Sequence, residues 1–313
     1  MSLAHRERKS SSTRLLINLS TCQLVNSSTL TYMANYYCFM AGLPTVKLTD
    51  AQPQHTLLQL KEELADVLES QDARLMERYF LRFDCENLAA LLADADAELD
   101  GRGNYDREAL GQLIEDAREL DGAVKGFPAF MADFVRDYDA HAGQAGWFPR
   151  DAALLAYYDY ARECPNTMMA EWYDLNFNIL NILTALIARR QGWSLADYVQ
   201  GSGAVVDAIL KQANQPDFGL GAELDYVKDL MQAAETTDPV EKERLIDALR
   251  WNWLEEKTFF EPFDITALFA YVVRSEILER WALLDPEQGR ERFTEIIENL
   301  RGEAKVPEEF IRK

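Results

Sequence analysis

The chain has 313 residues, 48% of them hydrophobic, and its 53 acidic residues outnumber 32 basic ones to give a net charge of -21. This apolar content is enough to bury a large core, so we expect a folded protein. The negative charge repels phosphates, which argues against nucleic acid and favours protein partners with basic faces. Four cysteines lack the paired spacing of zinc sites and disulfide frameworks, which favours a reducing, cytoplasmic compartment.

The N-terminal stretch 1–32 differs in composition from the rest of the chain. It carries four basic residues, one acidic residue and many serines, with little helical periodicity. We expect a disordered extension here, and we expect translation to begin at Met33. No apolar run in the sequence reaches the roughly 20 residues that a membrane span needs.

From Leu57 onward, apolar residues recur at the spacing of an amphipathic helix, as in Leu57, Leu60 and Leu64. Further helices are expected at 72–95, 106–119, 127–141, 149–163, 166–191, 203–213, 222–235, 239–257, 264–283 and 286–301. Only residues 35–40 allow a strand, or alternatively an extended entry segment packed on the helices. The sequence therefore predicts an all-α protein.

Gly and Pro clusters mark the breaks between these helices. The break that ends at Gly146 separates a first helical subdomain, 33–146, from a second helical region, 147–313, which has room for two pseudo-repeats. Asp238 and Asp285 each precede a proline, so each is expected to cap the start of a helix.

The segment from Asp174 through Asn176 to Asn178 imitates the opening of a calcium-binding loop. The sixth position is Ile179 where a glycine is required, and the twelfth is Ala185 where a glutamate belongs. The segment also lies inside a strong helical pattern, so we do not assign a calcium site.

Other chemistry has little support in the sequence. None of the three histidines follows a glutamate by three residues, as a di-iron bundle would require, and no nucleophile motif is present. A carboxylate-bound magnesium enzyme remains an alternative, with the pairs Asp94/Asp96 and Asp137/Asp139 as poor candidates. We therefore assign no catalytic, cofactor-binding or metal-binding residue, and we expect neither an enzyme nor a small-molecule substrate.

A helix pattern with two polar residues appears twice. Asp84 and Asn87 stand three residues apart beside a leucine stripe, and Asn178 and Asn181 take the same places in a later helix. Residues three apart share a helix face, so such pairs can fix the register of neighbouring helices by hydrogen bonding. Coincidence between two amphipathic helices is the alternative.

A third helix, 267–281, is apolar on one face and charged on the other. Its charged face is either solvated or a docking face, because Trp and Arg are enriched in interface hot spots. The candidates for positions at helix seams or partner contacts, with core packing as the leading role for most, are Asp84, Asn87, Trp172, Tyr173, Asn178, Asn181, Tyr271, Glu276 and Arg280.

These residues carry a resemblance to a known family. The segment 79–92 resembles the "fL-x-x-yD-x-x-Nl-x-x-l" helix of the central-stalk C family (d in eukaryotes) of V-type and archaeal-type ATPases. The stretch 172–189, followed by Gly192 and Leu195, is similar to the second "D-x-x-Ni-x-x-l-x-a-r-x-x-g" helix of that family. Tyr271 with Glu276 resembles its C-terminal "aY-x-x-x-x-x-Ei" helix.

The opening segment 36–44 looks closer to an uncharacterised bacterial family whose genes lie among V-type ATPase genes. The resemblance covers most of residues 33–313. Two positions depart from it: Asn178 replaces an Asp, and Trp281 stands where the family tends to have Arg.

The resemblance implies an elongated or funnel-like helical socket of two to three related subdomains, placed between the membrane rotor ring and the central axle of a rotary ATPase. Such a part transmits torque and makes no bonds, and it lies on the cytoplasmic face of the membrane through protein contacts. The acidic surface would face basic cytoplasmic loops of the ring. A helical adaptor or assembly factor is the alternative function.

Overall fold

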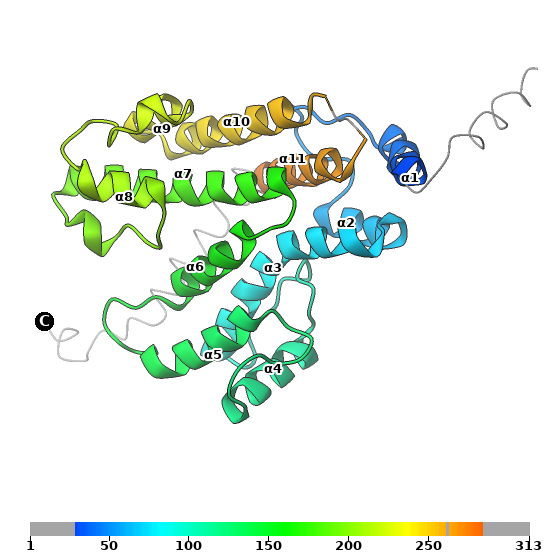
Figure 1. The fold of residues 1–313 in the computed structure, drawn as a ribbon, viewed down its shortest axis with the longest axis horizontal. Coiled ribbons are helices and arrows are strands. Elements are labelled where there is room, and N and C mark those ends of the chain that lie inside the picture. The colour runs from blue at the N-terminus through cyan, green and yellow to red at the C-terminus, as the bar shows by residue number, and fades with distance from the viewer. Residues whose placement is uncertain (1–28, 261–262, 284–313) are drawn as a thin grey trace, which may run out of the picture. The chain divides into compact units, whose positions relative to one another are not determined.

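The computed structural model describes residues 29–260 and 263–283. These residues form eleven α-helices, two short 3-10 helices and no strand, which confirms the all-α expectation (Figure 1). Residues 1–28 of the expected extension and the expected helix 286–301 lie outside the described residues. The chain divides into two compact units, and the division falls between Leu43 and Pro44.

The first unit contains α1, Thr29–Gly42. The alternatives of a strand or an extended segment at residues 35–40 are therefore wrong, because these residues lie within the helix. No glycine or proline interrupts the stretch before Gly42, so the backbone ladder can continue. It closes with the N–H of Leu43 donating to the carbonyl of Phe39 at 3.2 Å.

The second unit contains ten α-helices within the described residues, and their bounds follow the apolar spacing closely. They are α2 Leu57–Val67, α3 Ser70–Ala93, α4 Arg107–Glu119, α5 Ala129–His141, α6 Pro149–Arg162, α7 Thr167–Gln191, α8 Ala204–Lys211, α9 Val227–Glu235, α10 Pro239–Thr258 and α11 Ile265–Leu283. The short helices are η1 Leu195–Asp197 and η2 Leu220–Ala222.

Side-chain caps set several helix starts. Thr56 forms a capping box with Gln59 before α2, and Asp238 accepts the N–H of Val240 at 2.9 Å before the proline that opens α10. The expected helix at 222–235 starts later, at Val227. The preceding chain is held instead in η2, because Asp217 accepts backbone N–H groups from this segment.

The helices of this unit form a continuous series of contacts (Figure 1). α3 packs on α6, α6 on α7, α7 on α9, α9 on α10 and α10 on α11, while α4 and α5 pack on each other beside α6. α11 also contacts α2 and α7. Contacts of α3 and α5 with α6 thus join helices from both sides of the division expected at residue 146.

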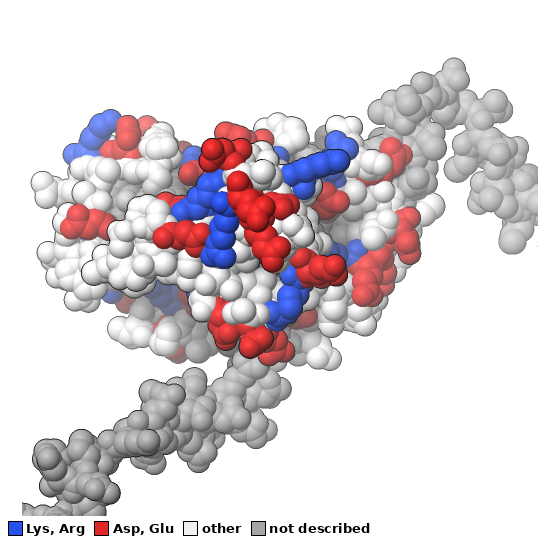
Figure 2. All heavy atoms as spheres, turned by 90° about the horizontal axis from the view of Figure 1, so that it is seen from below, with Lys and Arg blue, Asp and Glu red and all other residues white. Residues whose placement is uncertain are grey.

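The surface of the described residues mixes charges of both signs. On the face drawn in Figure 2, acidic and basic side chains are interleaved, and the basic ones form no broad patch. Within the described part of the chain, every helix is too short or too polar to cross a membrane.

Candidate functional site

The first polar pair, Asp84 and Asn87 on α3, holds the loop of residues 100–105, called here the first loop. The Asp84 carboxylate accepts the backbone N–H groups of Asn104 and Tyr105, each at 2.9 Å. The Asn87 amide exchanges two hydrogen bonds with the backbone of Asp100, at 2.8 and 2.9 Å. Both side chains are buried. The pair therefore fixes a loop that follows its own helix, where we expected contacts with neighbouring helices.

Glycine is required where the first loop crosses Asp84. A Cβ atom at Gly103 would lie 2.5 Å from Oδ1 of Asp84, closer than atoms normally approach. Lys61 of α2 reaches the same place, and its ammonium group donates to the carbonyls of Arg102, at 2.9 Å, and Gly103. The first loop is thus held between a buried carboxylate and a half-buried lysine.

Burial changes the pKa values of Asp84 and Lys61. It raises the pKa of Asp84 to about 6, although the N–H groups of Asn104 and Tyr105 and the charge of Lys61 act in the opposite direction. It also lowers the pKa of Lys61, against the attraction of Asp84 and Asp100. The first loop is therefore attached through groups that can titrate.

The second polar pair, Asn178 and Asn181 on α7, has a similar task. Oδ1 of Asn181 accepts the backbone N–H of Gln200 at 2.8 Å, in the segment of residues 197–203 called here the second loop. Asn178 itself is half-buried, and it acts to lower the pKa of Tyr226, just before α9, against the larger raising effect of burial. A glycine again stands at the close approach: Gly201 has φ of +73°, and a Cβ there would lie 2.6 Å from the Phe177 ring.

The third motif, on α11, binds α3 directly. Glu276 accepts a hydrogen bond from the Tyr79 hydroxyl and forms an ion pair with Arg82. Burial opposes ionisation of Glu276, but the charge and hydrogen bond of Arg82 outweigh it, so the pKa of Glu276 lies below its ordinary value. Tyr271 is buried on the same helix, and burial raises its pKa.

The three motif helices meet around one aromatic side chain, Phe269 of α11, which is fully buried. The Phe269 ring lies 5.2 Å from that of Tyr79 on α3, and 6.3 Å from the rings of both Trp172 and Tyr173 on α7. These edge-to-face contacts explain why aromatic residues precede each polar pair by one to two turns. Trp172 and Tyr173 therefore pack in the core.

Arg280 belongs to a second buried network, centred on Asp247 of α10. Arg280 bonds the Asp247 carboxylate, Trp281 donates to it at 2.8 Å, and Arg250 does so at 3.1 Å. Arg250 continues to the Asn176 amide oxygen on α7 at 2.9 Å. The charge of Arg280 is thus satisfied within the chain, which weakens its candidacy as a docking residue.

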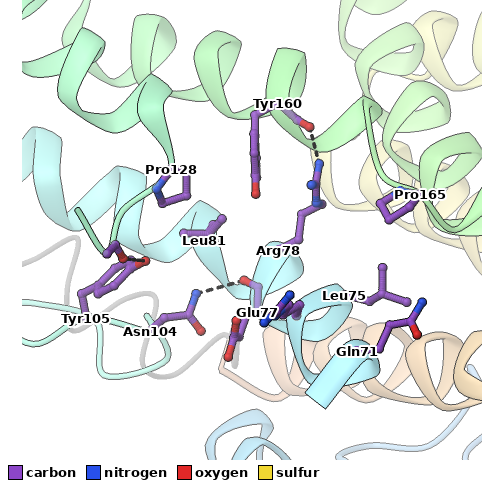
Figure 3. A pocket seen from close by; sticks show the side chains of 12 residues that line it. Gln71, Leu75, Glu77, Arg78, Leu81, Asn104, Tyr105, Pro128, Tyr160 and Pro165 are labelled. Carbon is purple, nitrogen blue, oxygen red and sulfur yellow. Dashed lines mark hydrogen bonds between the residues drawn. The ribbon is translucent and has the colours of Figure 1, made fainter. Parts of the chain in front are cut away.

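Each polar-pair loop borders a cavity on the surface. The first, called here the Arg78 cavity, has a volume of about 590 Å³ and lies beside Asn104 and Tyr105 of the first loop (Figure 3). Arg78 stacks 4.0 Å from the Tyr160 ring centroid and donates to the Tyr160 carbonyl at 2.5 Å. Arg74 and Glu77 line the same cavity, so its charged lining residues are two arginines and one glutamate.

The second cavity, called here the acidic pocket, has a volume of about 540 Å³ and lies between α6, α7 and the second loop. Its apolar walls include Phe148, Leu180 and Tyr198, all exposed to solvent. Asp151 and Asp197 are its charged members, and none of its described lining residues is basic. Such a surface suits an apolar side chain flanked by basic residues.

Most of the chain matches the model of one protein family. Residues 33–304 match the model of a family described as proteins of unknown function, DUF2764. The chain belongs to the DUF2764 family. No curated protein and no solved structure matches it.

The other residues considered for metal binding or reactivity have ordinary structural surroundings in this DUF2764 protein. Asp139 forms an ion pair with Arg118 at 2.8 Å, Asp137 lies 2.9 Å from Nδ1 of His141, and Asp94 accepts the backbone N–H of Asp96 at 3.0 Å. Burial raises the pKa of Cys85, which disfavours its thiolate. Among the residues that the structure describes, no three His, Cys, Asp or Glu side chains converge as metal ligands would.

Sequence reasoning missed two residues that the DUF2764 fold uses heavily. Asp247 was overlooked, although a charged residue between the apolar Ile246 and Leu249 is a detectable signal for a buried network. Arg82 was also overlooked, because its partner Glu276 lies on a distant helix. No local spacing links two such residues.

Proposed function

We propose that this protein is a non-catalytic, C/d-like component of the central stalk of a V-type rotary ATPase, coupling the membrane rotor ring to the central axle. One observation supports the proposal above others. The three helices that carry the resemblance, α3, α7 and α11, meet around Phe269, and Glu276 of the third motif bonds Tyr79 and Arg82 of the first. Residues that resemble one family's motifs thus form one connected cluster.

A torque-bearing part has to keep its shape under load, and the buried networks suit this task. The Glu276 cluster ties α11 to α3, and the Asp247 cluster ties α11 to α10 and α7. Buried ion pairs of this kind resist opening, because separating them leaves a charge uncompensated in a medium of low dielectric.

The acidic pocket is the surface we assign to the rotor ring. Basic cytoplasmic loops are common in membrane proteins, and this pocket offers Asp151 and Asp197 beside exposed aromatic anchors. The protein would then be peripheral to the membrane and attached through protein contacts. The other exposed carboxylates would speed association by attracting the same basic loops.

Co-expression with the ring and axle subunits of the same organism tests the proposal. We expect the three components to elute together from a sizing column at low salt, and to separate as salt rises, because screening weakens contacts between exposed charges. A chain that elutes alone at low salt would contradict the proposal. A chain that binds early assembly intermediates and is absent from the complete ATPase would identify an assembly factor instead.

A charge-reversed pair of variants locates the contact. Asp151→Lys combined with Asp197→Lys is expected to weaken co-elution at least tenfold, since each reversal replaces an attraction by a repulsion. Asp96→Lys combined with Asp121→Lys is the matched control, because both aspartates are exposed and neither lines the acidic pocket. Equal loss in both variants would show that net charge alone matters, and would remove the acidic pocket from the proposal.

A further inference from the structure

The largest of the described cavities, about 960 Å³, has no occupant among the described residues. It is a groove formed by the segment 48–51, the first half of α10 and the end of α11, and is called here the α10 groove. Leu48 and Val240 line it and are exposed, while Leu278 forms part of its floor and is buried. Exposed apolar walls of this kind need a partner surface.

The rim of the α10 groove is acidic. Asp50, Glu241 and Glu243 line it, and Glu243 lies 3.5 Å from Arg280. Asp247 also lines the groove but is buried and bonded to Arg280, and Arg244 is the only basic lining residue among those described. The Arg244 guanidinium lies 5.5 Å from the Trp281 ring centroid. The groove therefore favours an apolar occupant that brings basic residues to its edges.

The last described turn of α11 lies beside this groove. Trp281 lines the groove, and Leu283, two residues later, is the last described residue of α11 and is 63% exposed. Thirty residues, 284–313, follow in the sequence. Three peptide steps lead from Leu283 to Pro286, so a segment starting there begins within about 11 Å of Leu283.

The sequence of residues 286–301 fits such a site. Phe293, Ile296, Ile297 and Leu300 follow the spacing i, i+3, i+4 and i+7, which places them in one stripe along a helix. At 100° per residue, Arg290 and Arg292 fall on either edge of this stripe.

The glutamates of the same segment fall elsewhere on the predicted helix. Glu291, Glu295 and Glu298 lie on the side opposite the apolar stripe. A helix of 16 residues is about 24 Å long, enough to extend along several turns of α10. The match to the family model, which reaches residue 304, includes this segment within the shared unit.

We infer that residues 286–301 form an amphipathic helix that occupies the α10 groove of the same chain. The stripe from Phe293 to Leu300 lies against Leu48, Val240 and Leu278, with the two arginines at the acidic rim. The segment thereby closes the apolar surface beside the Asp247 network. This inference concerns the isolated chain and does not depend on the ATPase proposal.

Photo-crosslinking of the full chain tests the inference. A benzophenone amino acid is placed at Val240, with Leu48 as a second position and exposed Phe148 in the acidic pocket as the control. The crosslinked peptides are identified by mass spectrometry. We expect Val240 and Leu48 to crosslink to residues 290–301, and Phe148 to give no such product.

Two further measurements make the test decisive. Ile297→Asp is expected to lower the crosslink yield at least about fivefold, because it buries a charge, whereas the off-stripe control Asn299→Asp leaves it within about twofold. Mixing ¹⁴N- and ¹⁵N-labelled chains separates contacts within a chain from contacts between copies. Crosslinks only to a second copy, or none to residues 284–313 from either groove position, would overturn the inference.

Discussion

The first and second loops are held by similar devices with different chemistry. Both lie against a helix that carries two polar residues three apart, and both need a glycine at the closest approach. The first loop is anchored by an ionisable carboxylate, Asp84, whose pKa is raised by burial to about 6. The second is anchored by the neutral amide of Asn181. Asn181 corresponds in position to Asn87, and Asn178 stands where Asp84 does, so only the first loop is held by a carboxylate from its polar pair.

The largest effect is expected on removing the carboxylate anchor. Asp84→Ala leaves the N–H groups of Asn104 and Tyr105 without their acceptor, and the loss is about 3 kcal/mol in the free energy of unfolding. Asp96→Ala, an exposed carboxylate near the end of the same helix, is the control and is expected to cost under about 0.5 kcal/mol. Urea unfolding at pH 7 measures both, and equal losses would show that the first loop is not anchored at Asp84.

Asp84 also gives the first loop a pH dependence with a definite sign. Because its folded pKa of about 6 lies above the ordinary value of 3.8, protonation favours the folded state. This stabilisation is fully present below pH about 4 and is lost as pH rises to about 6. The wild type should lose on the order of 2 to 3 kcal/mol relative to Asp84→Asn across this range, at about 1.4 kcal/mol per pKa unit.

The two unfolding curves isolate this group, because all other titrating residues are common to both proteins. A difference between wild type and Asp84→Asn that stays constant from pH 4 to pH 6 would contradict the raised pKa. Asn181→Ala should leave the pH profile of the wild type unchanged, since the second loop has no titrating anchor at that position.

Gly201 of the second loop provides the next effect. Gly201→Ala puts an alanine at positive φ and drives its methyl group against Phe177, at a combined cost of about 2 kcal/mol. Gly122→Ala is the matched control: its φ is +99° but no atom lies near its Cβ, so only the backbone cost of about 1 kcal/mol remains. Chemical denaturation measures the loss in the free energy of unfolding for both variants, and the difference between the two losses is the steric part. Identical losses would contradict a clash with Phe177.

The smallest effect is expected at the neutral amide. Asn181→Ala removes the acceptor for the Gln200 N–H and should cost about 1 kcal/mol. Asn87→Ala removes two bonds to Asp100 and should cost about twice as much. Thermal unfolding of both variants shows which loses more stability. A larger loss for Asn181→Ala than for Asn87→Ala would show that the two loops are not held in the same way.

The sequence was sufficient for features that depend on neighbouring residues. Apolar spacing from Leu57 to Leu64 and the Asp238 cap both reappear as helix faces and helix starts. The helix α1 was not foreseen, because Tyr36, Tyr37 and Phe39 are residue types common in strands. Residue preferences at positions 35–40 are compatible with a strand as well as a helix. Only the longer stretch without glycine or proline, from Thr29 to Ala41, favours the helix.

The partners of the polar residues could not be predicted in the same way. Tyr79 and Glu276 are 197 residues apart, and Arg280 and Asp247 are 33 apart on different helices. Only the packing of α11 on α10, α7 and α2 brings such groups together. The sequence indicated that Asp84 and Asn181 are special, but their loop partners depend on chain paths that no helical spacing encodes.

The central claim, a place in the rotor of a V-type ATPase, is tested most directly by native mass spectrometry of the ATPase isolated from its own organism through a tag on the axle. A part on the single rotation axis occurs once, so we predict one copy of this chain in each complex that contains both ring and axle. Complexes that contain ring and axle without this chain would contradict the account.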